Sequence, residues 1–175
     1  MGSMHTGLEE VEGGFERLAA YFAERARGGV GMIITGGISP NEEGGMGSEM
    51  STPEHASDHR QVTEAVHAVD PNIKICMQIL HAGPLAETSK LVGPSAVRSR
   101  LSPLVPNELD EIGVQKQINV HVSCAKMAQL AGYDGVEIIG SAGYLLSTFL
   151  VEKTNQRGDQ WGGSYENRMR FPLEI

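Results

Sequence analysis

Apolar residues follow two kinds of spacing along this chain. In three long segments they recur every three or four positions, as on one face of an amphipathic helix. Those segments are residues 15–27, 53–69 and 111–132. Three short, mostly apolar runs lie between and after them, at residues 30–35, 74–80 and 135–139. Short runs of this kind predict strands that are buried on both faces, as in a parallel sheet.

The order of these elements predicts the fold class. Helices and strands alternate along the chain, and another helix is predicted to begin in residues 167–175. Parallel strands that are separated by helices form crossovers rather than hairpins. No G-x-G-x-x-G follows any predicted strand, which disfavours a doubly wound dinucleotide-binding sheet. The pattern therefore predicts an α/β protein with parallel strands and outer helices, the N-terminal half of a (β/α)₈ TIM barrel.

Local signals predict where several elements begin and end. Thr52 followed by Pro53 is typical of a helix N-cap with proline in the first turn. The pair Gly36 and Gly37 predicts the end of the strand before it. The chain opens with turn chemistry around His5 and has no residues for a strand ahead of it. We therefore expect residues 1–175 to be the N-terminal part of one barrel domain, truncated at both ends.

Composition and charge exclude some classes of protein. The chain has 175 residues, of which 40% are hydrophobic and 21% charged, as in a globular domain with a core. The net charge is -8, which argues against binding to nucleic acid or an anionic membrane. No apolar run approaches the roughly 20 residues that span a bilayer. No signal-peptide pattern is present either.

Cysteine and histidine positions add little chemistry. Cys76 and Cys124 lie far apart, and we expect both to be buried free thiols. Since the chain has no framework of cysteines, a reducing, cytoplasmic location is expected. His55 and His59 are four residues apart on a predicted helix, but no third ligand is placed near them. No metal site is predicted.

The most unusual stretch is residues 135–163. It begins as an apolar strand, breaks at glycines, and then presents Tyr144. A polar run follows from Lys153 and is closed by Trp161. In α/β proteins, chemistry lies at the C-terminal ends of strands. The connector of residues 81–110 is also long, and structureless connectors of such length are usually functional.

Five stretches of the chain carry a resemblance to a known family. They are GSMHTGLEE, ERLAAYFAERARGGV, QILHAG, AGYDGVEIIGSAGYLLSTFL and TNQRGDQWGGSYENRMRF. Together they resemble the flavin-binding barrel of the Old Yellow Enzyme superfamily. In particular they resemble the N-terminal half of that barrel in bacterial 2,4-dienoyl-CoA reductases. The resemblance covers nearly the whole chain, and the order and spacing of the last two stretches are highly specific.

The resemblance implies that FMN lies across the C-terminal mouth of the barrel. It carries flavin contacts onto Ser3, Met4, His5, Gly37 and Gln78. Glycine lets backbone N–H groups approach the ring system closely, and a buried amide can donate and accept along the pyrimidine edge. The alternative for Gln78 is an internally satisfied polar residue at a strand end. The resemblance implies that FAD, a 4Fe–4S cluster and NADPH belong only to a missing remainder of the enzyme. No C-x-x-C that could hold the cluster is present among these residues.

The resemblance implies that Tyr144 is the proton donor. Reduced flavin passes hydride to a conjugated chain, and the developing dienolate needs a proton from a group within hydrogen-bond reach. The alternative is a core tyrosine that packs on Phe149. Many relatives bind a substrate carbonyl with two histidines, or a histidine and an asparagine, where this chain has Ile139 and Ala142. That departure favours the dienoyl-CoA branch.

Two further positions leave the substrate site open. Pro84 stands where relatives usually carry arginine, so the resemblance carries over no contact from that position. Lys153 stands where the close relative has a basic residue near the acyl-CoA, with a solvated lysine as an equal alternative. Lys153 is therefore a candidate substrate-binding residue, and the expected substrate is a small-molecule acyl-CoA.

The expected function is reduction of a conjugated carbon–carbon double bond by an FMN-dependent, NAD(P)H-dependent oxidoreductase. The favoured substrate is 2,4-dienoyl-CoA in the β-oxidation of unsaturated fatty acids. One alternative is another flavin oxidoreductase of the Old Yellow Enzyme type or one like trimethylamine dehydrogenase. Another is an inactive fragment, or a half-barrel that assembles with a partner or with itself. We expect the 175 residues alone not to bind FMN stably.

Overall fold

The computed structural model describes residues 1–175, which form two compact units. The first unit comprises Met1–Ile38, Gly47–Ile79 and Ser123–Ile138. The second comprises Ser39–Met46, Leu80–Val122 and Ile139–Ile175. None of the helices combines the length and the apolar character that a membrane crossing requires.

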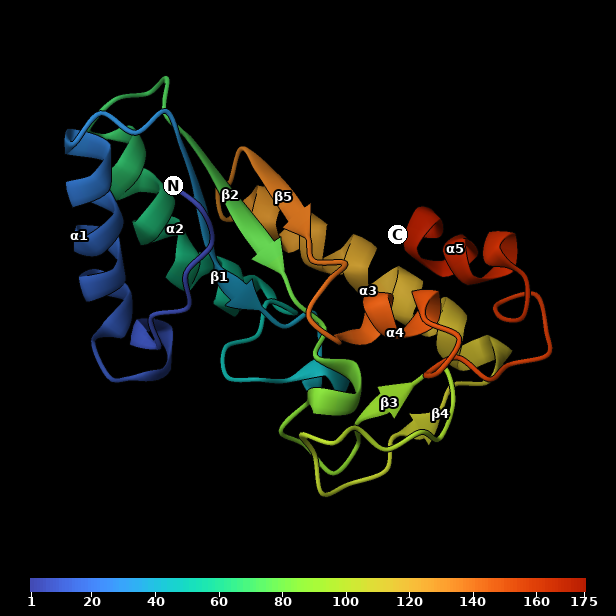
Figure 1. Ribbon diagram of the computed structural model, residues 1–175. Helices are drawn as coiled ribbons and strands as arrows, with labels where there is room; N and C mark the ends of the chain where they lie inside the picture. Colours follow the sequence, from blue (N-terminus) through green and yellow to red (C-terminus); the bar gives the residue numbers. More distant parts are fainter. The chain divides into compact units, whose positions relative to one another are not determined.

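The first unit is built on a sheet of three parallel strands, β1 (Met32–Ile38), β2 (Lys74–Ile79) and β5 (Gly135–Ile138), in the order β1-β2-β5. Helices α1 (Gly14–Arg27) and α2 (Pro53–His67) lie side by side in this unit (Figure 1). The short helix η1 (Leu8–Glu10) precedes α1, and the end of α3 (Glu111–Leu130) completes the unit. The predicted α/β fold with parallel strands is confirmed.

The two faces of this sheet differ in character. Ile33, Ile75, Met77 and Ile79 are almost fully buried in the core that the helices cover. Burial of each such side chain contributes about 1.5–3 kcal/mol. Because successive side chains point to opposite faces, the intervening residues line the other face. They form one row of Ile34, Cys76 and Gly135, and a second row of Gly37, Gln78 and Glu137.

The prediction that β1 ends at Gly36 and Gly37 is wrong. The strand continues to Ile38 and contains a β-bulge, because three steps in β1, from Ile34 to Gly37, match two steps in β2. A Cβ atom at Gly36 would lie 2.8 Å from the Cα of His5 and 2.9 Å from the carbonyl oxygen of Met4. The glycine therefore admits a crossing backbone segment rather than ending the strand.

The first residues lie along β1. The Met1 amino group donates to the carbonyl oxygen of Met32 at 2.5 Å, and the Met1 carbonyl accepts from the N–H of Ile34 at 3.1 Å. These two bonds bracket Ile33 in the pattern of a parallel strand pair.

The start of α2 matches its sequence signal, and the burial of one of the two cysteines differs from the prediction. Thr52 caps α2 by accepting from the N–H of His55 at 3.3 Å, with Pro53 as the first helical residue. Both cysteines are free, and Cys124 is buried as predicted. Cys76 is only partly buried, because it lies on the sheet face away from the helices.

The second unit contains short elements that the sequence pattern did not predict. These are η2 (Glu42–Gly44), η3 (Gly83–Leu85), the paired parallel strands β3 (Val92–Gly93) and β4 (Asn107–Glu108), and α4 (Leu145–Leu150). The chain ends in α5 (Tyr165–Glu174), which Ser164 caps. Six residues are too few for a helical period to be recognised, so α4 is visible in the sequence only as an apolar patch.

The polar run after α4 serves the fold. The guanidinium of Arg157 is buried, donates to the carbonyl oxygens of Pro94 and Leu109, and pairs with Asp159. The amide of Asn155 donates to the carbonyl oxygens of Phe149 and Trp161, both within 2.8 Å. Asn155 and Arg157 thus bind backbone groups within the unit and hold the run in place.

We expect Arg157→Lys to lower the free energy of unfolding by about 2 kcal/mol, because an ammonium group cannot replace the planar fork that reaches both carbonyls and Asp159. Urea denaturation measures the change. Arg27→Lys is the matched control, since Arg27 forms only an exposed pair with Glu24 and should change stability by less than about 0.5 kcal/mol. Equal losses in the two variants would contradict the structural role of Arg157.

Candidate functional site

The predicted cofactor residues all belong to the first unit, near the C-terminal ends of its strands. Gly37 and Gln78 are direct partners in the register of β1 and β2. The backbone of Met4 and His5 crosses β1 at Gly36, one residue before Gly37. Ser3 directly precedes this crossing and is exposed. The sheet therefore brings the three predicted segments to one place.

Gln78 is fixed from both neighbouring strands. Its side chain is buried, and its backbone N–H donates to the hydroxyl of Thr35 in β1 at 3.1 Å. Its amide nitrogen donates to the carboxylate of Glu137 in β5 at 2.8 Å. The amide oxygen of Gln78 has no hydrogen-bond partner within the chain. Sequence reasoning missed Glu137, although a carboxylate within an apolar strand was a signal that could have found it.

The side chains of Met4 and His5 point to other partners. The sulfur of Met4 accepts from the hydroxyl of Tyr21 at 3.2 Å. The His5 ring lies 2.9 Å from Glu10 and 3.6 Å from Glu9. The structure therefore brings the backbone of this segment to the strand ends, whereas the two side chains are engaged at the surface.

Tyr144 belongs to the second unit and caps the N-terminus of α4. Two residues with positive φ precede it, Ala142 at 60° and Gly143 at 81°, and its N–H donates to the carbonyl of Ser141 at 3.3 Å. Its hydroxyl makes no hydrogen bond within the chain. Phe149, the residue on which a core tyrosine was expected to pack, stacks instead on Phe171 with a centroid separation of 4.1 Å.

Tyr144 lines a cavity of about 620 Å³, within the size range of small-molecule pockets. The walls are mainly apolar, and their only charged residue is Glu87. The remaining lining residues are Met46, Leu85, Ala86, Thr88, Ser89, Leu101, Ser102, Pro103, Leu104 and Ala142. Part of the long 81–110 connector thus forms the walls around the candidate acid.

A buried network surrounds His81. Its Nδ1 accepts from the N–H of Gly83 at 3.1 Å, so Nε2 carries the proton and donates to Gln117 at 3.0 Å. Gln117 in turn donates to Glu43. Burial, followed by the charge of His121, lowers the pKa of His81 to about 3. The neutral ring thus links Gly83 of η3 to Gln117 of α3.

The network also reaches the turn that carries Tyr144. The carbonyl oxygen of His81 accepts from the N–H of Leu145 at 3.0 Å. Pro84, which follows, is buried in the first turn of η3. Lys153 is exposed and forms no ion pair or hydrogen bond within the chain. Nothing in the second unit therefore restrains the Lys153 ammonium group.

His59 and a second cavity lie elsewhere in the first unit. His59 is buried, and its Nδ1 lies 2.8 Å from the hydroxyl of Tyr133, so the ring is part of the core.

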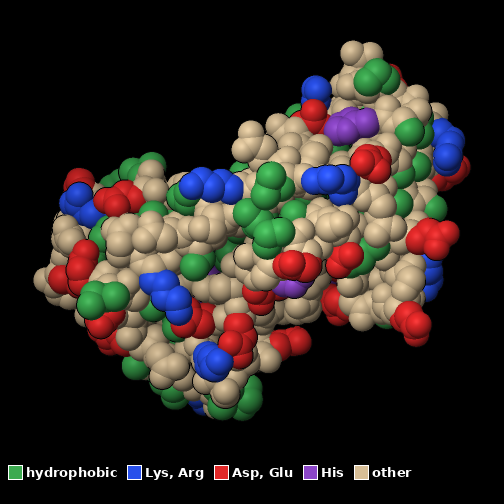
Figure 2. All heavy atoms as spheres, turned by 180° about the vertical axis from the view of Figure 1, so that it is seen from behind, with side chains coloured by type: hydrophobic (Ala, Val, Ile, Leu, Met, Phe, Trp, Pro, Cys, Tyr) green, Lys and Arg blue, Asp and Glu red, His purple; other side chains and the backbone are tan.

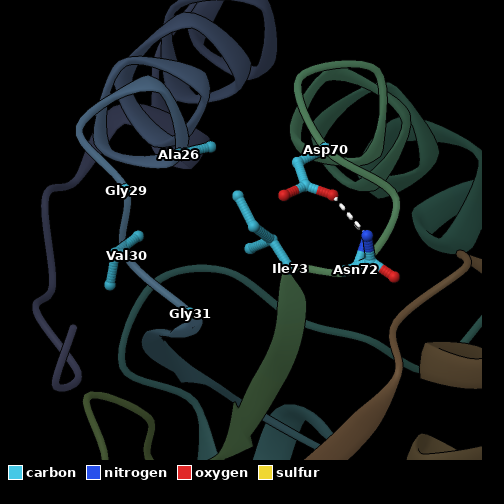
Figure 3. Close-up of a pocket in the computed structure, with 7 residues that line it drawn as sticks. All are labelled: Ala26, Gly29, Val30, Gly31, Asp70, Asn72 and Ile73. Atoms are coloured by element: carbon cyan, nitrogen blue, oxygen red, sulfur yellow. Dashed lines mark hydrogen bonds between the residues drawn. The ribbon is translucent and has the colours of Figure 1, made fainter.

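Figure 3 shows a cavity of about 170 Å³ at the start of β1 and β2, at the opposite end of the strands from Gln78. Its carboxylate, Asp70, accepts from the backbone and side chain of Asn72, both at 2.9 Å.

Charged side chains form no region of one sign on the face of the molecule that Figure 2 shows. Acidic and basic side chains are interspersed over the face drawn in Figure 2. Together with the net charge of -8, this leaves no basic patch on that face for a polyanion.

Comparisons with known proteins agree on the family. The model of the NADH:flavin oxidoreductase / NADH oxidase family matches residues 1–175. NADH oxidase of Thermoanaerobacter brockii is 36% identical over all of this chain and 28% of its own length. Morphinone reductase superposes with a TM-score of 0.83 at 30% identity, over 90% of this chain and 48% of that one. The complex of 2-naphthoyl-CoA reductase with 2-naphthoyl-CoA superposes with a TM-score of 0.83 at 29% identity, over 91% of this chain and 27% of that one.

These comparisons confirm the predicted fold class. The solved neighbours are TIM barrels of the Old Yellow Enzyme type, and the chain covers 48% of morphinone reductase. They do not separate the dienoyl-CoA branch from its relatives, since oxidases and reductases of several kinds match at similar identity.

The buried histidines make stability depend on pH. Burial lowers the pKa of His59 from 6.5 to about 4 and that of His81 to about 3. The unfolded chain therefore takes up these protons at higher pH than the folded chain, and the stability they contribute is full above about pH 6.5 and lost below it. We expect the free energy of unfolding to fall by about 2 kcal/mol per histidine between pH 7 and pH 5, as measured with urea.

His59→Gln should remove roughly a third of this pH-dependent loss, because it removes one of the three buried imidazoles, those of His59, His81 and His121, whose pKa burial lowers. His5→Gln, at a half-exposed ring, serves as the control. Between pH 7 and pH 5 it should lose as much free energy of unfolding as the unaltered protein does. An unchanged pH dependence in His59→Gln would show that His59 is not held neutral in the core.

Proposed function

We propose that this chain, which belongs to the NADH:flavin oxidoreductase / NADH oxidase family, forms the cofactor-binding and acid-bearing part of an FMN-dependent, NAD(P)H-linked reductase of the Old Yellow Enzyme type. One observation carries the proposal. Gln78 presents an amide oxygen without a partner beside Gly37, at the strand end where the Met4–His5 backbone crosses.

The residues at this strand end fit a flavin. Gly37 offers backbone without a side chain, and Gln78 offers an acceptor for a pyrimidine N–H. The backbone of Ser3, Met4 and His5 would supply further polar contacts. When bound, FMN supplies the hydride chemistry. The chain's own contribution is to bind, orient and hold the ring system.

We assign Tyr144 the role of proton donor. A phenol in a mostly apolar cavity, with a hydroxyl free of internal hydrogen bonds, can give its proton to a substrate carbon that develops negative charge. The turn of Ala142 and Gly143 and the bond from Leu145 to His81 orient the residue.

The favoured substrate is a conjugated acyl-CoA, such as a 2,4-dienoyl-CoA from the oxidation of unsaturated fatty acids. Three observations support it. The cavity beside Tyr144 is mainly apolar, as an acyl chain requires. Ile139 and Ala142 cannot hydrogen-bond a ketone. A structural relative was solved with 2-naphthoyl-CoA, and the exposed Lys153 could meet phosphate groups of such a ligand.

A second candidate is a reductase of simple α,β-unsaturated ketones. Morphinone reductase supports this candidate, because this chain superposes on it with the same TM-score, 0.83, as on 2-naphthoyl-CoA reductase. The full-length gene product that contains these residues, assayed with a 2,4-dienoyl-CoA and with a simple enone, decides between the two. Turnover of the enone alone would reject the acyl-CoA assignment.

In the same assay, Tyr144→Phe should lower kcat by about 10²–10⁴-fold and leave the Kd for FMN unchanged, because it removes one acidic proton and no cofactor contact. Tyr165→Phe is the control, since Tyr165 is exposed on α5 and should retain full turnover. Turnover by Tyr144→Phe equal to that of the control would remove Tyr144 from the mechanism.

The 175 residues match 48% of morphinone reductase, so part of that barrel has no counterpart among them. We therefore expect the 175-residue chain alone to lose FMN on gel filtration, because it offers only some of the barrel's contacts. Absorbance of the eluted protein near the flavin bands measures this. Stoichiometric retention of flavin by the 175 residues would contradict the expectation.

A further inference from the structure

We propose that Glu137 is a positioning residue for the cofactor: it fixes the amide of Gln78 so that the oxygen, and not the NH₂ group, faces the flavin. The inference rests on the proposed FMN binding and goes beyond it, because it assigns a role to a residue that does not itself contact the cofactor.

One hydrogen bond, from the Gln78 amide to the Glu137 carboxylate, carries the inference. Gly37, Gln78 and Glu137 occupy one row across β1, β2 and β5. The Gln78 amide nitrogen donates to Oε2 of Glu137 at 2.8 Å, and no other side chain donates to that carboxylate. Gln78 is 6% exposed, so its side chain has little freedom to choose another arrangement.

The surroundings leave Glu137 without a competing donor. Lys74, on the same face of β2, pairs with Asp134 at 3.0 Å. Cys76, in the neighbouring row, is a neutral thiol, since burial and the charges of Asp134 and Glu137 raise its pKa. Gln78 is therefore the group on which the carboxylate acts.

The direction of the amide follows from its neighbours. The two ends of a glutamine amide have nearly the same shape, so hydrogen-bond partners decide which end lies where. An ionised carboxylate only accepts. Turning the amide over would place two acceptor oxygens 2.8 Å apart at the observed positions. Glu137 thereby makes the free end of Gln78 an acceptor.

An acceptor suits one part of a flavin. The pyrimidine ring carries an N–H flanked by carbonyl oxygens, and an amide oxygen can pair with the N–H. An NH₂ group in its place would leave that N–H unpaired and would stabilise negative charge on the ring. Loss of Glu137 should therefore weaken FMN binding and raise the midpoint potential of bound FMN.

The experiment uses the full-length gene product and FMN itself. Glu137→Met keeps the side-chain length and removes the acceptor, whereas Glu137→Gln keeps an acceptor oxygen. We expect about a tenfold rise in the Kd for FMN and a higher midpoint potential in Glu137→Met, against less than about threefold in Glu137→Gln. Glu64→Met, at an exposed position of α2, should leave both values unchanged.

A double-mutant cycle tests whether Glu137 acts through the amide. In a Gln78→Leu background the same Glu137→Met change should alter the Kd by less than about twofold, because the group it positions is gone. If Glu137→Met does not fold, Glu137→Ala supplies the same comparison.

Three results would overturn the inference. They are an unchanged Kd and potential in Glu137→Met, an equally large effect in the Gln78→Leu background, and an equally large effect of Glu137→Gln. In each of these cases the unaltered protein still binds FMN, so the proposed function stands. Unaltered protein that takes up no FMN would overturn the proposed function and this inference together.

Discussion

The register of the three parallel strands is the constraint on which the candidate cofactor site depends. Side chains alternate between the faces of a strand, so a slip of one residue would exchange the two faces. The observed register buries Ile75, Met77 and Ile79 under the helices. The same register aligns Gln78 with Gly37 on one side and with Glu137 on the other. Core and candidate site are thus two consequences of one alignment.

The β-bulge in β1 makes that alignment possible. Ile33 and Ile38 are both buried in the core, yet they are five residues apart, and strict alternation would place them on opposite faces. The extra residue between Ile34 and Gly37 corrects the phase, returns Ile38 to the core and sets Gly37 beside Gln78. From the sequence alone a glycine pair is a stop signal, because the crossing of β1 by residues 4–5 depends on tertiary structure.

The difference between local signals and tertiary contacts separates what the sequence could predict from what it could not. Strands and long helices follow from periods of two and 3.6 residues, which are local properties. The contact of Gln117 with His81 and Glu43 joins residues 36 and 74 positions apart, and no local pattern encodes it. Nor does polarity alone identify a site. Arg157 and Gln78 are both buried polar residues near unusual motifs, but every nitrogen of the Arg157 guanidinium donates within the chain, whereas the Gln78 oxygen accepts nothing.

Tyr144 follows a turn that holds one residue in a costly backbone conformation. Ala142 has a φ of 60°, a conformation that costs an L-residue on the order of 1 kcal/mol. The turn is held by the bond from Tyr144 to Ser141 and by that from Leu145 to His81. Three neighbouring features therefore fix the backbone of a tyrosine whose hydroxyl then binds nothing in the chain. Tyr144 packs against the buried cluster of Ala82, Ala86 and Leu91 and also lines the cavity, so the strained turn sets the position of a residue that lies between core and cavity.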